Sequence, residues 1–138
     1  MSEQENLKLV QQSYAAFKTG NINGVLSTLA DDIGCFVPGP RDIVPFVGRR
    51  QGHEQVAEAI TKFVEMQDTE QFEVQEFVAR GDKVVAFGHY QWRVKSTGHS
   101  YESDFAHAFT ISHGKISRFQ EYVDTSGHPV LGGRISHG

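Results

Sequence analysis

The sequence contains little of several residue types, and each shortage excludes a class of protein. Only one of its 138 residues is a cysteine, so no internal disulfide can form, and this usage fits the reducing cytoplasm. Basic residues are fewer than acidic ones, 13 against 17, and the isoelectric point of about 5.9 argues against a nucleic-acid-binding protein. No apolar run approaches the ~20 residues of a membrane span, and the acidic, polar residues 1–6 do not form a signal peptide. We therefore expect a cytoplasmic protein with neither nucleic acid nor a membrane as its partner.

Motifs for metals, nucleophilic thiols and phosphates are also missing. The seven histidines include no pair spaced four residues apart and accompany no set of cysteines. Cys35 lies in an apolar run, which disfavours a reactive thiolate. Gly48 and Gly52 are not followed by the Lys-Ser/Thr pair of a phosphate-binding loop. We expect neither a metal nor a cofactor.

The residues that are present predict helices in the first half of the chain. Leu7, Val10, Tyr14 and Phe17 recur at steps of three and four residues, as on one face of an amphipathic helix that ends near residue 20. A shorter helix is predicted from about residue 23 to residues 31–32, and a strand over 33–37. Residues 41–52 are predicted to form a loop, and helical spacing returns over 56–64.

In the second half the apolar spacing changes to two residues. Gly81-Asp82, Thr97-Gly98 and His113-Gly114 punctuate this part as turns. The pattern predicts an antiparallel meander of four strands near 71–80, 83–96, 99–112 and 115–124. Helices followed by such a sheet make an α+β domain, which we assign to residues 1–126, with a C-terminal tail over 127–138.

The register of these strands predicts which side chains share a face. If each turn has two residues, Gly88 lies opposite His107, which leaves room above the imidazole, and His107 lies opposite Gln120. A bulge would exchange the faces beyond it. The resulting face is aromatic with a few titratable groups, which is typical of a ligand pocket, and it carries Tyr90, Trp92, Phe105, His107, Arg118, Gln120, Tyr122 and Asp124.

The opposite face of the sheet is predicted to be an interface. His89, Ala106 and Glu121 fall in one row there, with Phe87 and Phe119 nearby. A mixed apolar and polar outer face suits association, so we expect a homodimer through this face.

Three segments together resemble the nuclear transport factor 2-like superfamily, which includes ketosteroid isomerases and SnoaL-like polyketide cyclases. They are Leu29-Ala30-Asp31-Asp32, the loop over 45–52 that leads into a helix, and the ending over 113–124. The resemblance implies a cone-shaped, cystatin-like fold with N-terminal helices packed on a curved antiparallel sheet. It also implies a pocket inside the cone and, commonly, a homodimer through the outer sheet face.

The resemblance carries only some of the family's functional residues to this chain. The position of the ketosteroid isomerase base holds Val37, and the Arg-x-Asp spacing of limonene-epoxide-hydrolase relatives occurs only in the turn over 80–82. SnoaL-like cyclases use a pocket aspartate late in the chain assisted by a histidine, which implies Asp124 and His107.

These residues predict a pocket for a small apolar carbonyl compound, with two readings of its role. As an enzyme, the protein would use a desolvated Asp124 as a general base, while His107 or Tyr122 stabilises the oxyanion. As a non-catalytic binding or interaction module, it would have a solvated Asp124 and a His107 bonded within the core. In either reading the ligand-binding residues are predicted to be Tyr14, Phe17, Phe36, Tyr90, Trp92, Phe105, Arg118 and Gln120.

Overall fold

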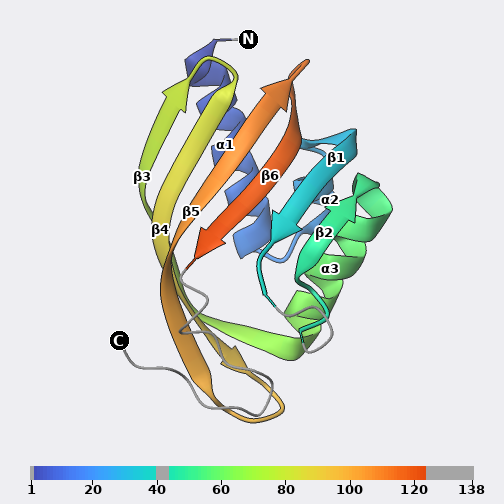
Figure 1. The fold of residues 1–138 in the computed structure, drawn as a ribbon, viewed down its shortest axis with the longest axis vertical. Helices are drawn as coiled ribbons and strands as arrows, with labels where there is room; N and C mark the ends of the chain where they lie inside the picture. The colour runs from blue at the N-terminus through green and yellow to red at the C-terminus, as the bar shows by residue number, and fades with distance from the viewer. Residues whose placement is uncertain (1, 40–43, 124–138) are drawn as a thin grey trace.

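Three helices pack on the concave side of one curved sheet (Figure 1). The computed structural model describes residues 2–39 and 44–123, and the helix and strand counts refer to these ranges. The elements in chain order are α1 (Glu3–Lys18), α2 (Ile22–Leu26), β1 (Leu29–Val37), β2 (Gly48–Gln51), α3 (Gly52–Met66), β3 (Gln67–Arg80), β4 (Lys83–Val94), β5 (Ser100–Ser112) and β6 (Lys115–Val123).

The predicted α+β fold is confirmed, with two differences in the sheet and one in the helices. The predicted helix from about residue 23 to residues 31–32 is too long, because α2 ends at Leu26 and residues 29–32 belong to β1. The strand order is β2-β1-β6-β5-β4-β3, so the predicted four-strand meander is present. However, β1 runs parallel to β6, which makes the sheet mixed rather than wholly antiparallel. The predicted loop over 41–52 was wrong at its end, because residues 48–51 form β2 against β1. No helix in the described ranges is both long and apolar enough to cross a membrane.

Helix α1 begins and ends where local chemistry dictates. The Ser2 side chain accepts a hydrogen bond from the Glu5 amide, and the Glu5 side chain accepts one from the Ser2 amide, which completes a capping box. The chain leaves the helix through Gly20, whose φ of 73° favours glycine. The buried face of α1 carries Val10 and Tyr14, which pack into the core above the sheet.

The β4–β5 hairpin has a longer loop than predicted. Residues 95–98 form a four-residue loop closed by a hydrogen bond from the Val94 amide to the His99 carbonyl oxygen, at 2.8 Å. The register therefore shifts by two residues, and Gly88 lies opposite Phe105 rather than His107. A shift of two keeps every side chain on its predicted face. The predicted room above the His107 imidazole was wrong, because the Phe105 ring stacks on it at 4.2 Å.

A bulge in β6 reverses the predicted faces of that strand. The His113-Gly114 turn forms as predicted and pairs Ile111 with Ile116. Thr110 then pairs with Arg118, so Ser117 is an extra residue in β6. Beyond it, Phe119, Glu121 and Val123 oppose inward-facing residues of β5, and Arg118, Gln120 and Tyr122 face outward.

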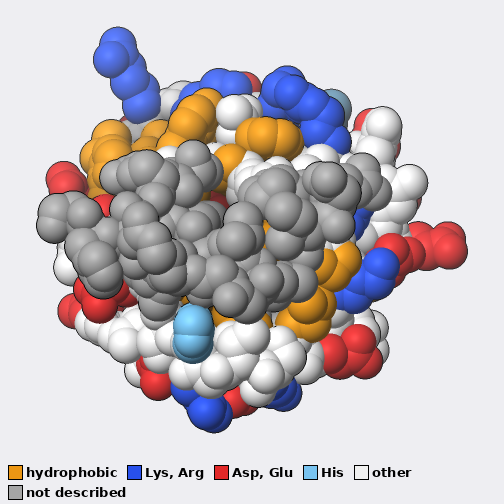
Figure 2. All heavy atoms as spheres, turned by 60° about the horizontal axis from the view of Figure 1, so that its bottom comes forward, with side chains coloured by type: hydrophobic (Ala, Val, Ile, Leu, Met, Phe, Trp, Pro, Cys, Tyr) orange, Lys and Arg blue, Asp and Glu red, His pale blue; other side chains and the backbone are white. Residues whose placement is uncertain are grey.

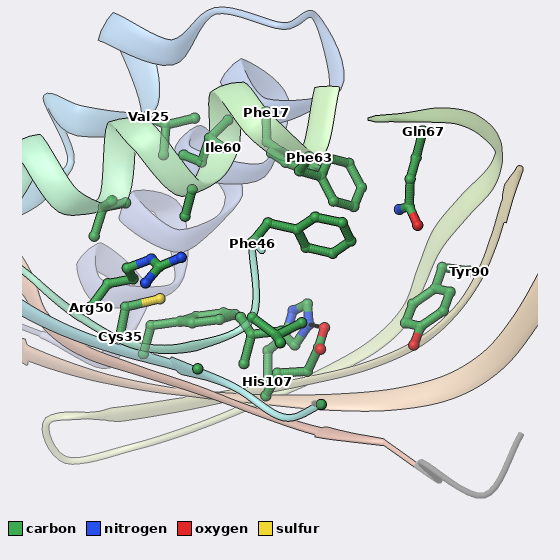
Figure 3. A pocket seen from close by; sticks show the side chains of 18 of the residues that line it. Phe17, Val25, Cys35, Phe46, Arg50, Ile60, Phe63, Gln67, Tyr90 and His107 are labelled. Atoms are coloured by element: carbon green, nitrogen blue, oxygen red, sulfur yellow. Dashed lines mark hydrogen bonds and ion pairs between the residues drawn. The ribbon is translucent and has the colours of Figure 1, made fainter. Parts of the chain in front are cut away.

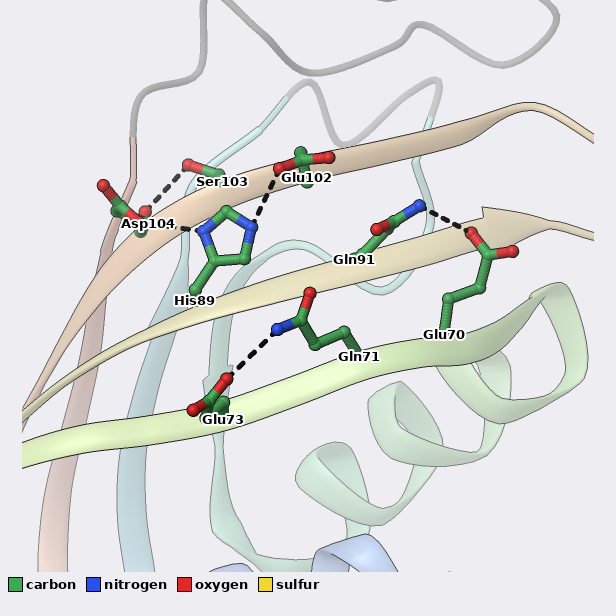
Figure 4. A network of polar contacts seen from close by, with 8 residues as sticks. All are labelled: Glu70, Gln71, Glu73, His89, Gln91, Glu102, Ser103 and Asp104. Atoms are coloured by element: carbon green, nitrogen blue, oxygen red, sulfur yellow. Dashed lines mark hydrogen bonds and ion pairs between the residues drawn. The ribbon is translucent and has the colours of Figure 1, made fainter.

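A network of polar side chains covers part of the outer face of the sheet (Figure 4). The His89 imidazole contacts a carboxylate oxygen of Asp104 at 2.8 Å and one of Glu102 at 3.0 Å. Farther from His89 on this face, amide–carboxylate hydrogen bonds join Gln91 to Glu70 and Gln71 to Glu73. This part of the outer face therefore presents polar side chains that bond to one another.

The outer row of side chains differs from the predicted one. The expected row of His89, Ala106 and Glu121 was wrong, because the β6 bulge takes Glu121 and Phe119 to the concave side. Ala106 instead pairs with Phe87 and Tyr122, which are 40% and 54% exposed. Hydrophobic side chains also reach the surface beside Lys and Arg side chains on the face shown in Figure 2.

Candidate functional site

A cavity of about 210 Å³ lies between the helices and the concave face of the sheet (Figure 3). It is somewhat larger than an apolar cavity of ~150 Å³ that binds benzene. The cavity therefore has the size for a ligand of one or two rings. Its wall is mainly hydrophobic, and the side chains from the helices and from the segment before β2 include Phe17, Val25, Phe46, Ile60 and Phe63.

Four of the six predicted aromatic wall residues line this cavity, namely Tyr14, Phe17, Tyr90 and Trp92. The other two do not. Phe105 faces inward but lies against the Phe72 ring, at 5.4 Å, and against His107. Phe36 pairs with Arg49, whose guanidinium lies 4.9 Å from the centre of the Phe36 ring.

A chain of three hydrogen-bonded side chains forms the polar part of the cavity. The Tyr14 hydroxyl lies 2.6 Å from His107 Nδ1, and His107 Nε2 lies 2.9 Å from Glu121 Oε1. Tyr14 comes from α1, His107 from the middle of β5 and Glu121 from β6 after its bulge. Tyr14 and His107 are 9% and 5% exposed, and the Glu121 side chain is 13% exposed. Helix and sheet thus meet through a buried polar relay inside an apolar cavity.

The chemistry of the three groups orders the protons along this relay. A carboxylate can only accept hydrogen bonds, so beside an ionised Glu121 the proton belongs on His107 Nε2. In the neutral imidazole Nδ1 then accepts the hydrogen bond that the Tyr14 hydroxyl donates. Burial raises the pKa of Tyr14 above its ordinary value, and the negative charge of Glu121 raises it further, so this phenol remains a donor. The relay therefore orients Glu121 through a fixed imidazole tautomer.

One carboxylate oxygen of Glu121 is left for a ligand. Within the described part of the chain, Glu121 is held only through Oε1, by His107. Both ring nitrogens of His107 already have protein partners, so His107 does not offer a donor directly to the cavity. Glu121 therefore lines the cavity with one carboxylate oxygen, Oε2, that no described residue holds.

Two further buried polar side chains line the cavity at opposite ends (Figure 3). Arg50 is 6% exposed and donates from Nη2 to the Pro45 carbonyl oxygen, whereas its Nε is buried with no partner among the described residues. Gln67 is also 6% exposed and accepts a hydrogen bond from the Tyr101 hydroxyl, whereas its Nε2 is buried and likewise has no partner within residues 2–39 and 44–123. A buried donor without an acceptor costs about 1–3 kcal/mol, so both residues favour a bound acceptor.

Cys35 also lines the cavity, but as an inert group. Burial raises the pKa of its thiol to about 12, and the charge of Glu121 adds to this effect. The thiol is therefore protonated at neutral pH, which agrees with the expectation from its apolar surroundings in the sequence.

Three of the remaining predicted site residues lie away from the cavity. Arg118, Gln120 and Tyr122 lie on the outer face, because the extra residue in β6 reverses the strand that carries them. Asp124 lies outside the described residues. The described ranges contain no group of His, Cys, Asp and Glu side chains suited to a metal ion.

Sequence reasoning missed Glu121, Arg50 and Gln67 as cavity residues. Glu121 was assigned to the outer face by a two-residue alternation that the bulge interrupts. Arg50 lay in a segment predicted as a loop, and the sequence Gly-Arg-Arg-Gln over 48–51 has no alternation of apolar and polar residues that would reveal an inward side chain. Gln67 follows helix α3 directly, where no pattern distinguishes an inward from an outward side chain.

Comparisons with known proteins agree on one family. A family model described as a SnoaL-like domain matches residues 10–119. An NTF2-like protein from Burkholderia xenovorans LB400 is 37% identical with a TM-score of 0.82, over 91% of this chain and 93% of that chain. TerC, co-crystallized with polyporic acid, is 27% identical with a TM-score of 0.78, over 88% of this chain and 92% of that chain.

A more distant structure shows likeness of fold alone. It is a Catenulispora acidiphila protein with a ketosteroid isomerase-like fold, in complex with trimethylamine. It is 18% identical with a TM-score of 0.73, over 91% of this chain and 90% of that chain. The sequence matches no curated protein.

Proposed function

This chain belongs to the SnoaL-like family, and we propose that it binds a small, mainly apolar carbonyl compound and moves a proton on the carbon beside the carbonyl. The observation that carries the proposal is the Tyr14–His107–Glu121 relay, which leaves one carboxylate oxygen free in an apolar cavity. TerC was co-crystallized with polyporic acid, which supports a cavity that takes a small organic molecule.

In the proposed reaction Glu121 is the general base. Its free oxygen takes a proton from the α-carbon, and the electron pair of the C–H bond enters the carbonyl system to give an enolate. Returning the proton at another carbon completes an isomerisation. Alternatively, the enolate carbon attacks a second carbonyl and closes a ring, the π electrons of that carbonyl move to its oxygen, and the resulting alkoxide takes the proton back from Glu121. His107 positions the carboxylate, and Tyr14 holds the imidazole tautomer.

The sequence-based assignments that no observation tests remain predictions. Asp124 is still predicted as a general base, and the protein is still predicted to be cytoplasmic. A homodimer through the outer sheet face is supported by the apolar row of Phe87, Ala106 and Tyr122, of which Phe87 and Tyr122 are exposed. Sedimentation of a Phe87→Glu variant tests this dimer, which we expect to dissociate.

A non-catalytic ligand-binding protein is the second candidate. The observation that favours it is that both nitrogens of His107 are bonded to protein groups, as in a histidine whose role is to complete a polar core. In that case the role of Glu121 is structural: it binds His107, which in turn bonds to Tyr14 of α1. A ligand would then bind in the cavity and dissociate without reacting.

Exchange of α-protons in deuterated water separates the two candidates. 2-Tetralone is a bicyclic ketone with exchangeable α-protons, and loss of their NMR signals measures proton transfer directly. We expect the wild-type protein to accelerate exchange over buffer and Glu121→Gln to reduce the protein-dependent rate by about 10²-fold or more, because general base catalysis contributes this much.

Glu102→Gln is the matched control, because it makes the same change on the outer face of the sheet. This variant should exchange at the wild-type rate. Binding of 2-tetralone without any exchange above buffer would favour the non-catalytic candidate, and equal rates in wild type and Glu121→Gln would refute Glu121 as the base.

A further inference from the structure

Arg50 is a buried cation placed in the cavity wall by the pairing of two strands. It lies opposite Cys35 in the β1–β2 pair, and both side chains line the cavity. Its neighbour Arg49 faces the other way, is exposed and covers the Phe36 ring. The alternation of β2 thus sends one arginine to the cavity and one to the outside.

The guanidinium of Arg50 has more donors than the protein uses. An arginine side chain carries five N–H donors and keeps its positive charge in proteins. Within the described residues, Arg50 donates a hydrogen bond only to the Pro45 carbonyl oxygen, and its Nε is buried without a partner. None of the ion pairs among these residues includes Arg50.

The other charged side chain of the cavity makes no ion pair with Arg50. Glu121 Oε1 lies 2.9 Å from His107 Nε2, and none of the ion pairs among the described residues joins Glu121 to Arg50. Among the described residues, Arg50 is therefore a buried cation with no carboxylate in direct contact, an arrangement that proteins rarely keep without a counter-charge. A ligand that enters the cavity with an anionic oxygen supplies that counter-charge.

We propose that Arg50 binds a carboxylate of the ligand, so that the preferred substrates are cyclic or aromatic oxo acids. This inference rests on the proposed function, because it names the substrate class of the same cavity. A guanidinium matches a planar carboxylate with two parallel hydrogen bonds, which adds both affinity and orientation. Gln67 lies at the opposite end with its own unpartnered amide nitrogen, which suits a neutral oxygen at the far end of the ligand (Figure 3).

A matched pair of bicyclic probes tests the proposal by isothermal titration. 2-Naphthoate carries a carboxylate where 2-acetylnaphthalene carries a neutral acetyl group of nearly the same shape. We expect wild type to bind 2-naphthoate at least ten-fold more tightly. Arg50→Met should lose this preference and keep its affinity for 2-acetylnaphthalene, whereas Arg49→Met should behave as wild type.

The outcomes separate this inference from the proposal on which it rests. If wild type binds 2-acetylnaphthalene as tightly as 2-naphthoate, the carboxylate site is refuted and the cavity for carbonyl compounds stands. If neither probe binds, both are overturned. If Arg50→Met keeps the preference for 2-naphthoate, Arg50 is not its source. The comparison of the two probes on wild type requires no variant to fold.

Discussion

Removing the Tyr14 hydroxyl should destabilise the protein by an amount that the structure sets. Tyr14→Phe deletes one oxygen and keeps the ring, which packs against Phe72, Phe77 and Phe109 at centroid distances of 5.7, 6.2 and 5.7 Å. The lost group is a buried donor 2.6 Å from His107 Nδ1. The variant therefore leaves a buried acceptor unpaired, which costs about 1–3 kcal/mol of unfolding free energy.

This free energy converts into a measurable change in melting temperature. An unfolding entropy of about 2.1 cal/mol/K per residue gives about 0.3 kcal/mol/K for 138 residues. We therefore expect Tyr14→Phe to lower the melting temperature by about 3–10 °C in a circular dichroism melt. Tyr122→Phe is the matched control, because that side chain is 54% exposed, and its free energy of unfolding should change by less than about 0.5 kcal/mol. Equal losses in the two variants, or none in Tyr14→Phe, would refute the relay as a stabilising element.

Three further predictions follow from other contacts. Gly88→Ala places a Cβ 2.2 Å from a backbone oxygen of β3, so chemical denaturation should show a loss of about 3 kcal/mol or more, while Gly34→Ala, with open space around its Cβ, should remain close to wild type. The hydrogen bond to Asp104 raises the pKa of His89 above its ordinary value, so the stability it contributes is complete below about pH 6.5 and is lost as the pH rises through the higher folded-state pKa. His89→Gln should thus lower the melting temperature more at pH 5.5 than at pH 9, and equal losses would contradict this assignment. Because burial raises the pKa of the Cys35 thiol to about 12, iodoacetamide at pH 8 should alkylate it in denaturant and leave it largely unreacted in the native protein; equal rates would contradict its burial.

The parts of the fold that depend on local patterns could be predicted from the sequence. The helical spacing that places Val10 and Tyr14 on one face is a property of four consecutive turns of α1. The turns at residues 81–82 and 113–114 depend on residues that adopt positive φ, and they formed where Gly81 and Gly114 predicted them. Each of these signals lies within a few residues, so no knowledge of the folded chain is needed.

The pairing of strands depends on details that residue type does not reveal. The hairpin near Gly98 has a four-residue loop instead of the predicted two-residue turn. Both kinds of loop accommodate a glycine with positive φ, as Gly98 has, so the glycine does not distinguish them. The parallel pairing of β1 with β6 joins segments far apart in the chain, and the spacing of apolar residues within either segment does not indicate its partner. Register and strand order are therefore decided by tertiary packing.

The same reason explains why the site could be predicted only in part. Tyr14 and His107 were identified because helix and strand alternation both point them to the inner face. Glu121 was missed because a single bulge at Ser117, favoured by a hydrogen bond from its hydroxyl to the Thr110 carbonyl oxygen, exchanges the two faces of β6. Burial of Phe119 on the concave side compensates for exposing Tyr122.

The central claim is that the free oxygen of Glu121 meets the reacting carbon of a carbonyl ligand inside the cavity. A crystal structure of the protein with bound 2-tetralone tests this claim most directly. We expect the ketone between the helices and the sheet, with an α-carbon within ~3.5 Å of Glu121 Oε2 and the Tyr14–His107–Glu121 relay intact. A ketone bound outside the cavity, or bound inside it with both α-carbons against the apolar wall, would contradict the account.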